Sequence, residues 1–200
     1  MRFLILILFF MSFLSAQEFE GDDFLIVEGE SLQYYYVLKK EGYYISDKPE
    51  KLNLYKKSIP ESLNVSLSTL TSVTHNSKTY LLYPGGGLLY SFIDGAIERI
   101  DRSFPHRNQY GGYFFSYKNN LYLIGGYGFW QTKSIITKFN FNNGDWEIIN
   151  TTGQLPKRLD KGTYFVVDDD LYVFDFLSRS TNNQKEKTED NLYVLNLKTF

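Results

Sequence analysis

The sequence lacks cysteine entirely, has only two histidines among its 200 residues, and carries no excess of charge of one sign. Without cysteine, disulfides, thiolate zinc sites and a cysteine nucleophile are excluded. Neither histidine has a second one at metal-ligand spacing, so we expect no metal and no cofactor. The 21 Lys and Arg against 23 Asp and Glu give a formal net charge of -2, which argues against a nucleic-acid partner.

Long hydrophobic runs are lacking outside the N-terminus. Arg2 is followed by an apolar run over residues 3–14 and then by the small residues Ser15 and Ala16. This layout is typical of a secretory signal peptide, and the run is shorter than the roughly 20 residues that span a bilayer. We predict cleavage after Ala16 and a secreted or periplasmic protein with no membrane span after cleavage. An uncleaved anchor or a buried strand is the alternative.

Aromatic residues are abundant, with 17 Tyr and 17 Phe, and they favour β-strands. Short aromatic and β-branched runs alternate with clusters of Asn, Asp and Gly, which supply tight turns. The sequence therefore predicts an all-β chain. The expected strands are Phe24–Val27, Leu32–Leu38, Tyr43–Ser46, Leu52–Lys56, Thr79–Tyr83, Leu88–Ile93, Tyr113–Tyr117, Leu121–Ile124, Ile135–Phe141, Tyr164–Val167, Leu171–Phe174 and Leu192–Leu197.

The chain repeats itself with a period near 50 residues. Residues 120–124 (Asn-Leu-Tyr-Leu-Ile) recur as residues 170–174 (Asp-Leu-Tyr-Val-Phe), and Pro-His-Arg at 105–107 recurs as Pro-Lys-Arg at 156–158. A fainter copy places Tyr80 at the position of the repeated tyrosine. Self-similarity at a fixed period indicates a tandem array of structural units.

The best copy, residues 105–150, resembles a kelch repeat, the four-stranded blade of one class of β-propeller. It has a hydrophobic strand that runs into a glycine doublet, then a variable loop, an aromatic strand and a tryptophan. The resemblance implies that the doublet ends the second strand of a blade and that the tryptophan packs between blades from the fourth strand. The residues it assigns to structural repeat positions are Tyr122, Gly125, Gly126, Phe139, Trp146 and Tyr172.

The resemblance predicts about three to four four-stranded antiparallel blades. Residues 1–16 form the signal peptide, 17–58 the N-terminal strands or a degenerate blade, 59–104 a weak kelch blade, 105–154 the best-matching blade, and 155–200 a blade lacking its last strand. Propellers close with four to eight blades. We therefore expect an incomplete ring, which is completed either by further blades beyond residue 200 or by self-association.

Five side chains are candidates for ligand binding. Tyr127, Phe129 and Trp130 follow the glycine doublet, where aromatics on a loop suit stacking on a sugar or gripping a peptide, although packing between blades explains them equally well. Arg107 and Arg158 occupy equivalent repeat positions. Each can hydrogen-bond a neighbouring blade or meet an anionic ligand near the central channel.

The remaining polar residues have structural interpretations. We interpret His75, beside Asn76 and Ser77, as a solvated turn residue, and His106 as too isolated to bind a metal. The run Asp168–Asp170 lacks the spaced pattern of a calcium loop, so a hairpin turn is the better interpretation.

These observations favour an exported kelch-repeat binding or scaffold module that contacts a protein or glycan through loops on one face, and they assign no catalytic residue. Part of an exported carbohydrate-active kelch enzyme, such as an oxidase or a sugar mutarotase, is the alternative, as is the extracellular sensor portion of a larger membrane protein. The copper site of galactose oxidase, a kelch-type enzyme, requires a Cys–Tyr crosslink that this chain cannot form.

Overall fold

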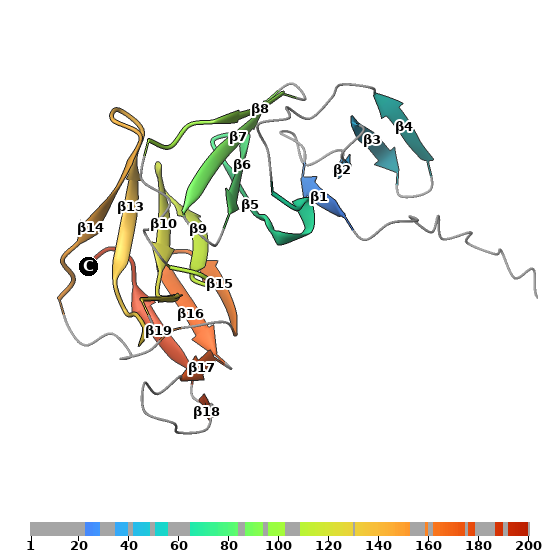
Figure 1. The fold of residues 1–200 in the computed structure, drawn as a ribbon. Coiled ribbons are helices and arrows are strands. Elements are labelled where there is room, and N and C mark those ends of the chain that lie inside the picture. The colour runs from blue at the N-terminus through green and yellow to red at the C-terminus, as the bar shows by residue number, and fades with distance from the viewer. Residues whose placement is uncertain are drawn as a thin grey trace, which may run out of the picture.

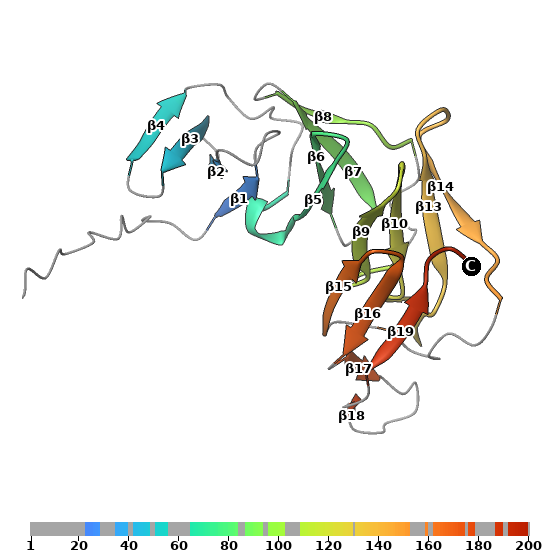
Figure 2. The same ribbon diagram turned by 180° about the vertical axis from the view of Figure 1, so that it is seen from behind.

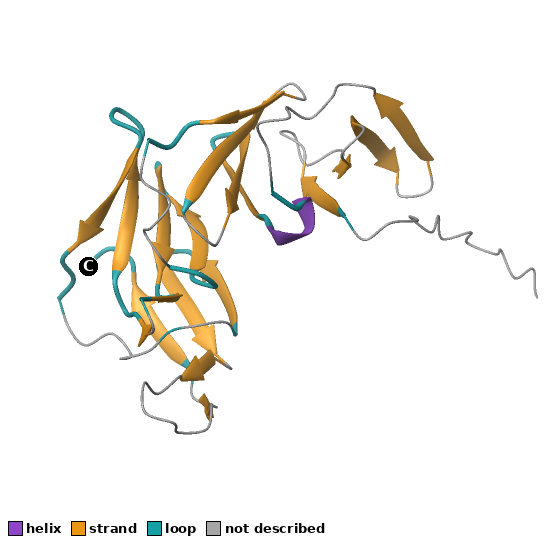
Figure 3. Ribbon diagram, in the orientation of Figure 1, coloured by secondary structure: helices purple, strands orange, loops and turns teal. Residues whose placement is uncertain are grey.

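The structure is a computed structural model that describes residues 23–28, 35–39, 42–48, 51–55, 65–83, 87–93, 96–102, 109–129, 131–152, 159, 162–174, 176–178, 187–189 and 192–199. These residues form antiparallel strands and a single 3-10 turn, η1 (Leu67–Thr69) (Figure 3). The prediction of an all-β chain is confirmed. The expected signal peptide lies outside the described residues.

The N-terminal sheet contains four antiparallel strands in chain order. They are β1 (Phe24–Glu28), β2 (Tyr35–Lys39), β3 (Gly42–Lys48) and β4 (Lys51–Tyr55). Val27 of β1 is buried against Leu67 and Leu70 of the η1 segment and against Leu81 of the next sheet. The N-terminal sheet is thereby joined to the rest of the molecule through an apolar cluster.

Three further sheets follow along the chain, and we call them sheets 1, 2 and 3. Sheet 1 contains β5 (Thr71–His75), β6 (Lys78–Tyr83), β7 (Leu88–Ile93) and β8 (Ala96–Arg99). Sheet 2 contains β9 (Tyr113–Tyr117), β10 (Asn120–Ile124), β13 (Ile136–Asn140) and β14 (Asp145–Ile149). Sheet 3 contains β15 (Thr163–Val167), β16 (Asp170–Phe174) and β19 (Tyr193–Asn196).

Two small hairpins complete the described strands. The first pairs β11 (Tyr127–Gly128) with β12 (Gln131–Thr132), and the second pairs β17 (Phe176–Ser178) with β18 (Lys187–Glu189). Sheets 1 to 3 lie side by side in chain order, and the N-terminal sheet lies beyond sheet 1 (Figures 1 and 2). In the part of the chain that the structure describes, the sheets do not close into a ring.

The internal repeat corresponds to equivalent strands of sheets 1 to 3. Tyr80, Tyr122 and Tyr172 all lie on the second strand of their sheet, in β6, β10 and β16. The hairpin before each of these strands contains a non-glycine residue with positive φ, namely Asn76, Lys118 and Asp168. Tight hairpin turns require this backbone conformation, so each repeat begins with the same kind of turn.

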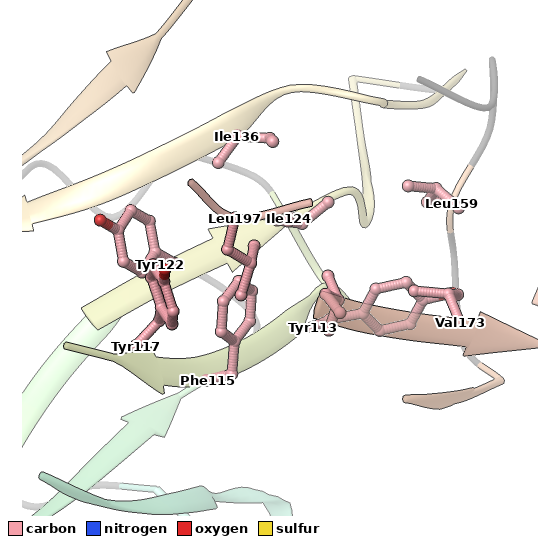
Figure 4. Close-up of a cluster of buried hydrophobic side chains, with 10 residues drawn as sticks. Tyr113, Phe115, Tyr117, Tyr122, Ile124, Ile136, Leu159, Val173 and Leu197 are labelled. Carbon is pink, nitrogen blue, oxygen red and sulfur yellow. The ribbon is translucent and has the colours of Figure 1, made fainter. Parts of the chain in front are cut away.

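The core lies between the sheets. Tyr80, Leu82 and Leu89 of sheet 1 pack against Phe114 and Trp146 of sheet 2, with other residues of both sheets. A second cluster joins sheet 2 to sheet 3 (Figure 4), and its buried members are Tyr113, Phe115, Tyr117, Tyr122, Ile124, Ile136, Leu159, Leu171, Val173 and Leu197. Each of these buried clusters therefore joins adjacent sheets.

His75 is not the solvated turn residue that the sequence suggested. It ends β5 with only 5% of its surface exposed, and Asn76 and Ser77 supply the turn. Its Nδ1 lies 2.8 Å from the hydroxyl of Ser116 in sheet 2, and its ring stacks at 6.0 Å on Phe141. The prediction was wrong because the partners of His75 lie about 41 and 66 residues away in sequence.

Candidate functional site

The glycine doublet that follows β10 forms a tight turn against two other segments. Gly125 and Gly126 have φ values of 72° and 88°. A Cβ on Gly125 would lie 2.5 Å from the carbonyl oxygen of Leu159, and one on Gly126 would lie 2.4 Å from the carbonyl carbon of Gln109. Only glycine combines this backbone conformation with such close approach. The doublet thus holds the segments that enter sheets 2 and 3 close together.

Gln109 is a buried hydrogen-bonding centre behind the doublet. Its Nε2 donates to the carbonyl oxygens of Leu123 and Gly125, at 3.3 and 3.1 Å, and its Oε1 accepts from the hydroxyl of Thr137 at 2.9 Å. No motif in the sequence singles out Gln109. No repeat signal could have found it, because the residue fifty positions later is Leu159. Gln109 fixes where β10 ends and where β13 runs beside it.

The β11–β12 hairpin projects from this turn and exposes an aromatic side chain. Tyr127 pairs with Thr132 within the hairpin and also forms a bridge with Tyr110. Phe129 occupies the hairpin turn with a φ of 51°, and 61% of its surface is exposed. A bulky non-glycine residue rarely adopts this conformation, since it costs about 1–3 kcal/mol. The tight turn of this hairpin requires the conformation, as do the turns at Asn76, Lys118 and Asp168, and here it places a bulky aromatic side chain at the tip.

A groove of about 620 Å³ lies beside Phe129 on sheet 2. This volume is within the range of small-molecule sites, which extends over roughly 300–1,000 Å³. The described residues that line the groove are Gln109, Phe129, Lys133, Ile135, Thr137, Asn143, Asp145, Trp146, Glu147 and Ile148. Ile148 on β14 is 66% exposed, so the groove has apolar surface beside polar groups.

Among the described residues that line the groove, Lys133 is the cation. Its ammonium group lies 4.9 Å from the centroid of the Phe129 ring, within the distance of a cation–π contact. Burial lowers the pKa of Lys133, because the partly apolar surroundings disfavour the charged form. Glu147, on the same groove, accepts hydrogen bonds from Asn140 and Asn143, at 2.7 and 3.2 Å. Its carboxylate is held by these amides, whereas the ammonium group of Lys133 lies beside the Phe129 ring.

The sequence-derived binding candidates separate into two groups. Phe129 lines the groove, and Tyr127 lies in the hairpin that positions Phe129. Trp130, Arg107 and Arg158 lie outside the described residues. Lys133 and Ile148 were not predicted, because neither belongs to a motif.

The expected repeat residues occupy structural positions. Trp146 is buried between sheets 1 and 2, where its indole N–H donates to the carbonyl oxygen of Gly87 at 2.9 Å. Phe139 packs edge-on against Trp146 at 5.3 Å. Tyr122 stacks on Phe115 at 5.5 Å within the cluster between sheets 2 and 3. Tyr172 stacks at 5.0 Å on Phe165, which belongs to the same sheet.

Asp168 and Asp169 form the β15–β16 turn, and Asp170 begins β16. Asp169 accepts a hydrogen bond of 2.5 Å from the hydroxyl of Tyr117, and it forms ion pairs with Lys118 and Lys198. The contact with Lys198, and then that with Tyr117, lowers the pKa of Asp169. Among the described residues, no three His, Cys, Asp or Glu side chains are grouped to hold a metal ion.

The described residues contain no helix with the length and apolar character that crossing a membrane requires. A scan against protein-family models gives no match to this chain. A search of the curated proteins gives no match either.

Proposed function

We propose that this chain is an exported, kelch-type β-propeller module, in whole or in part, that binds a glycan or a protein segment through loops on one face. Three consecutive antiparallel sheets with an internal repeat support the architecture, as do the glycine turn after β10 and the tryptophan between sheets 1 and 2. The N-terminal sequence supports export. Further blades or a second copy of the chain complete the ring.

The groove beside Phe129 is the proposed binding site. The observation that carries this proposal is the placement of an exposed aromatic side chain, in a costly backbone conformation, at the edge of a groove. Aromatic rings stack on the C–H faces of sugars and on apolar peptide side chains. Lys133, 4.9 Å from that ring, favours a ligand whose carboxylate lies next to the stacked group. An acidic glycan combines both features.

A glycan array that contains neutral and carboxylate-bearing sugars tests this proposal. We expect binding to acidic glycans and at least a tenfold loss of affinity in Phe129→Ala, which corresponds to about 1.4 kcal/mol. Lys133→Gln is expected to weaken the binding of acidic glycans and to leave the binding of neutral glycans unchanged. Phe165→Ala is the matched control, because this phenylalanine is also exposed but lies on sheet 3.

Phe129→Asn separates binding from folding. Asparagine tolerates positive φ, so this variant keeps the hairpin turn and is expected to fold at least as stably as the native chain. It loses the ring and should lose glycan binding. Trp130→Ala tests the neighbouring aromatic in the same assay. Glycan binding that survives Phe129→Ala, Phe129→Asn and Trp130→Ala would contradict the proposed site, as would an array on which the native protein binds nothing. Turnover of a sugar would contradict a purely binding function.

A further inference from the structure

A second, smaller hollow lies on sheet 2 at the turn between β13 and β14, next to the groove that Phe129 lines. Its volume is about 270 Å³, below the roughly 300–1,000 Å³ of sites that hold a whole small molecule. This size suits one unit of a larger ligand. We call it the Phe141 hollow, and its lining includes Asn120, Lys138, Asn140, Phe141, Asn142 and Glu147.

An exposed aromatic ring lines this hollow, as Phe129 lines the groove. Phe141 is 45% exposed, and its ring stacks on His75 at 6.0 Å and packs edge-on against Phe139 at 5.0 Å. A ring that neighbours already hold loses little conformational freedom when a ligand stacks on it. Phe129 precedes β13 and Phe141 follows it, so the two rings lie toward opposite ends of this strand. Each ring can therefore stack on a separate sugar unit.

The Phe141 hollow also has a cation of its own. Lys138 of β13 is half-buried, and no residue in the part of the chain that the structure describes forms a hydrogen bond or an ion pair with its side chain. Lys133 of the groove lies five residues earlier, at most about 18 Å away along an extended chain. The groove and the hollow therefore each offer a cation, and a ligand with carboxylates on more than one unit can meet both.

Glu147 connects the groove to the Phe141 hollow, because it lines both, and the neighbouring residues Asn142 and Asn143 line one each. Glu147 is in cross-strand register with Lys138, and its carboxylate accepts hydrogen bonds from Asn140 and Asn143. Carboxylate and amide oxygens accept hydrogen bonds from hydroxyl groups, whereas a ligand that carries only anionic groups has no donor for them. This junction favours a chain that carries hydroxyl groups between its carboxylates.

We infer that the binding site continues from the groove into the Phe141 hollow and takes an extended chain of uronic acid sugars. One carboxylate of the chain meets Lys133 and another meets Lys138, while Phe129 and Phe141 stack on separate sugar units. This assignment, which rests on the proposed function, specifies a chain with repeated carboxylates rather than a single acidic sugar at the end of a glycan.

Titration calorimetry with galacturonate oligomers, from the dimer to the octamer, tests this inference. We expect the octamer to bind at least tenfold more tightly than the dimer. Lys138→Gln should remove this gain, whereas Lys133→Gln should weaken the binding of both oligomers. Lys39→Gln is the matched control, because it removes the same charge from the N-terminal sheet, and it should bind as the native protein does. Circular dichroism confirms that each variant is folded.

Three results would overturn the inference and leave the proposed function intact. The first is equal affinity for the dimer and the octamer. The second is a gain with chain length that persists in Lys138→Gln, because such a gain comes from repetition of the sugar and not from the Phe141 hollow. The third is poly-glutamate binding as tight as that of the octamer, which charge alone explains. If no galacturonate oligomer binds, the dimer included, and the glycan array is also negative, the proposed function fails together with the inference.

Discussion

The imidazole of His75 lies between sheets 1 and 2 and makes two polar contacts. Nδ1 is 2.8 Å from the Ser116 hydroxyl, and the side-chain amide of Asn76 lies 3.2 Å from Nε2. Donation from the amide leaves Nε2 as the acceptor, which requires the neutral ring. Burial lowers the pKa of His75 below its ordinary value of 6.5. One residue therefore makes the contact between two sheets sensitive to acid.

Stability should fall as the pH drops through the weakly acidic range. The unfolded chain binds a proton at His75 near pH 6.5, but the folded chain does so only at a lower pH. The contribution of His75 to the free energy of unfolding is therefore complete above about pH 6.5, and it is lost as the pH falls through the pKa of the folded state. Urea unfolding from pH 7.5 to 5 measures this slope. His75→Gln is expected to flatten the slope, and equal slopes in the native protein and the variant would contradict the assignment.

At the scale of the element, the turn after β10 is fixed by close approach as well as by backbone conformation. The N–H of Gly126 donates to the carbonyl oxygen of Leu159, and that of Lys133 donates to the carbonyl oxygen of Gly126. The same turn therefore orders the segment before sheet 3 and the connection between β12 and β13, which carries Lys133 of the groove. A substitution that disrupts this turn should therefore lower the stability of the molecule and also alter the proposed site.

Gly126→Ala should destabilise the protein by at least about 2 kcal/mol, because it adds strain at a φ of 88° and a clash with the backbone of Gln109. Gly162→Ala is the matched control, since Gly162 has the same φ but is exposed. Thermal and chemical unfolding measure the loss of stability in each variant. If both substitutions lower the free energy of unfolding by the same amount, the close approach to Gln109 contributes nothing to the loss.

At the scale of the whole molecule, stability depends on contacts between sheets. Tyr164 of sheet 3 bonds to the backbone of β9 in sheet 2, where its hydroxyl accepts from the N–H of Phe114 at 3.2 Å and donates to the carbonyl oxygen of Phe114 at 2.8 Å. Burial raises the pKa of Tyr164. The surface ion pair between Asp169 and Lys118 also connects these two sheets, whereas the pair between Asp169 and Lys198 lies within sheet 3. Surface pairs of this kind contribute little to stability.

Tyr164→Phe should lower the free energy of unfolding by about 1–3 kcal/mol, because it leaves two backbone groups of Phe114 without their partner. The ring remains, so the packing between the sheets is preserved. Tyr110→Phe is the control, since Tyr110 is 53% exposed. Equilibrium denaturation measures both variants, and a loss no greater than that of the control would show that the hydroxyl contacts do not stabilise the contact between sheets.

Much of the secondary structure followed from the sequence, whereas much of the groove did not. The aromatic runs and the turn residues located most strands to within a few residues. Phe129, which lines the groove, was already a candidate, because aromatics on a loop after a glycine doublet form a local pattern. Lys133 and Ile148 were not candidates, because folding alone brings them to the groove. Local patterns cannot report such contacts.

The sequence by itself determined an all-β chain whose repeated strands recur every fifty residues, since strand propensity, turn chemistry and periodicity are local properties. Tertiary structure alone decided which faces are covered. Phe115 and Phe165 occupy equivalent positions in two repeats, yet one is buried and the other is 44% exposed. The difference arises because burial depends on whether a neighbouring sheet is present.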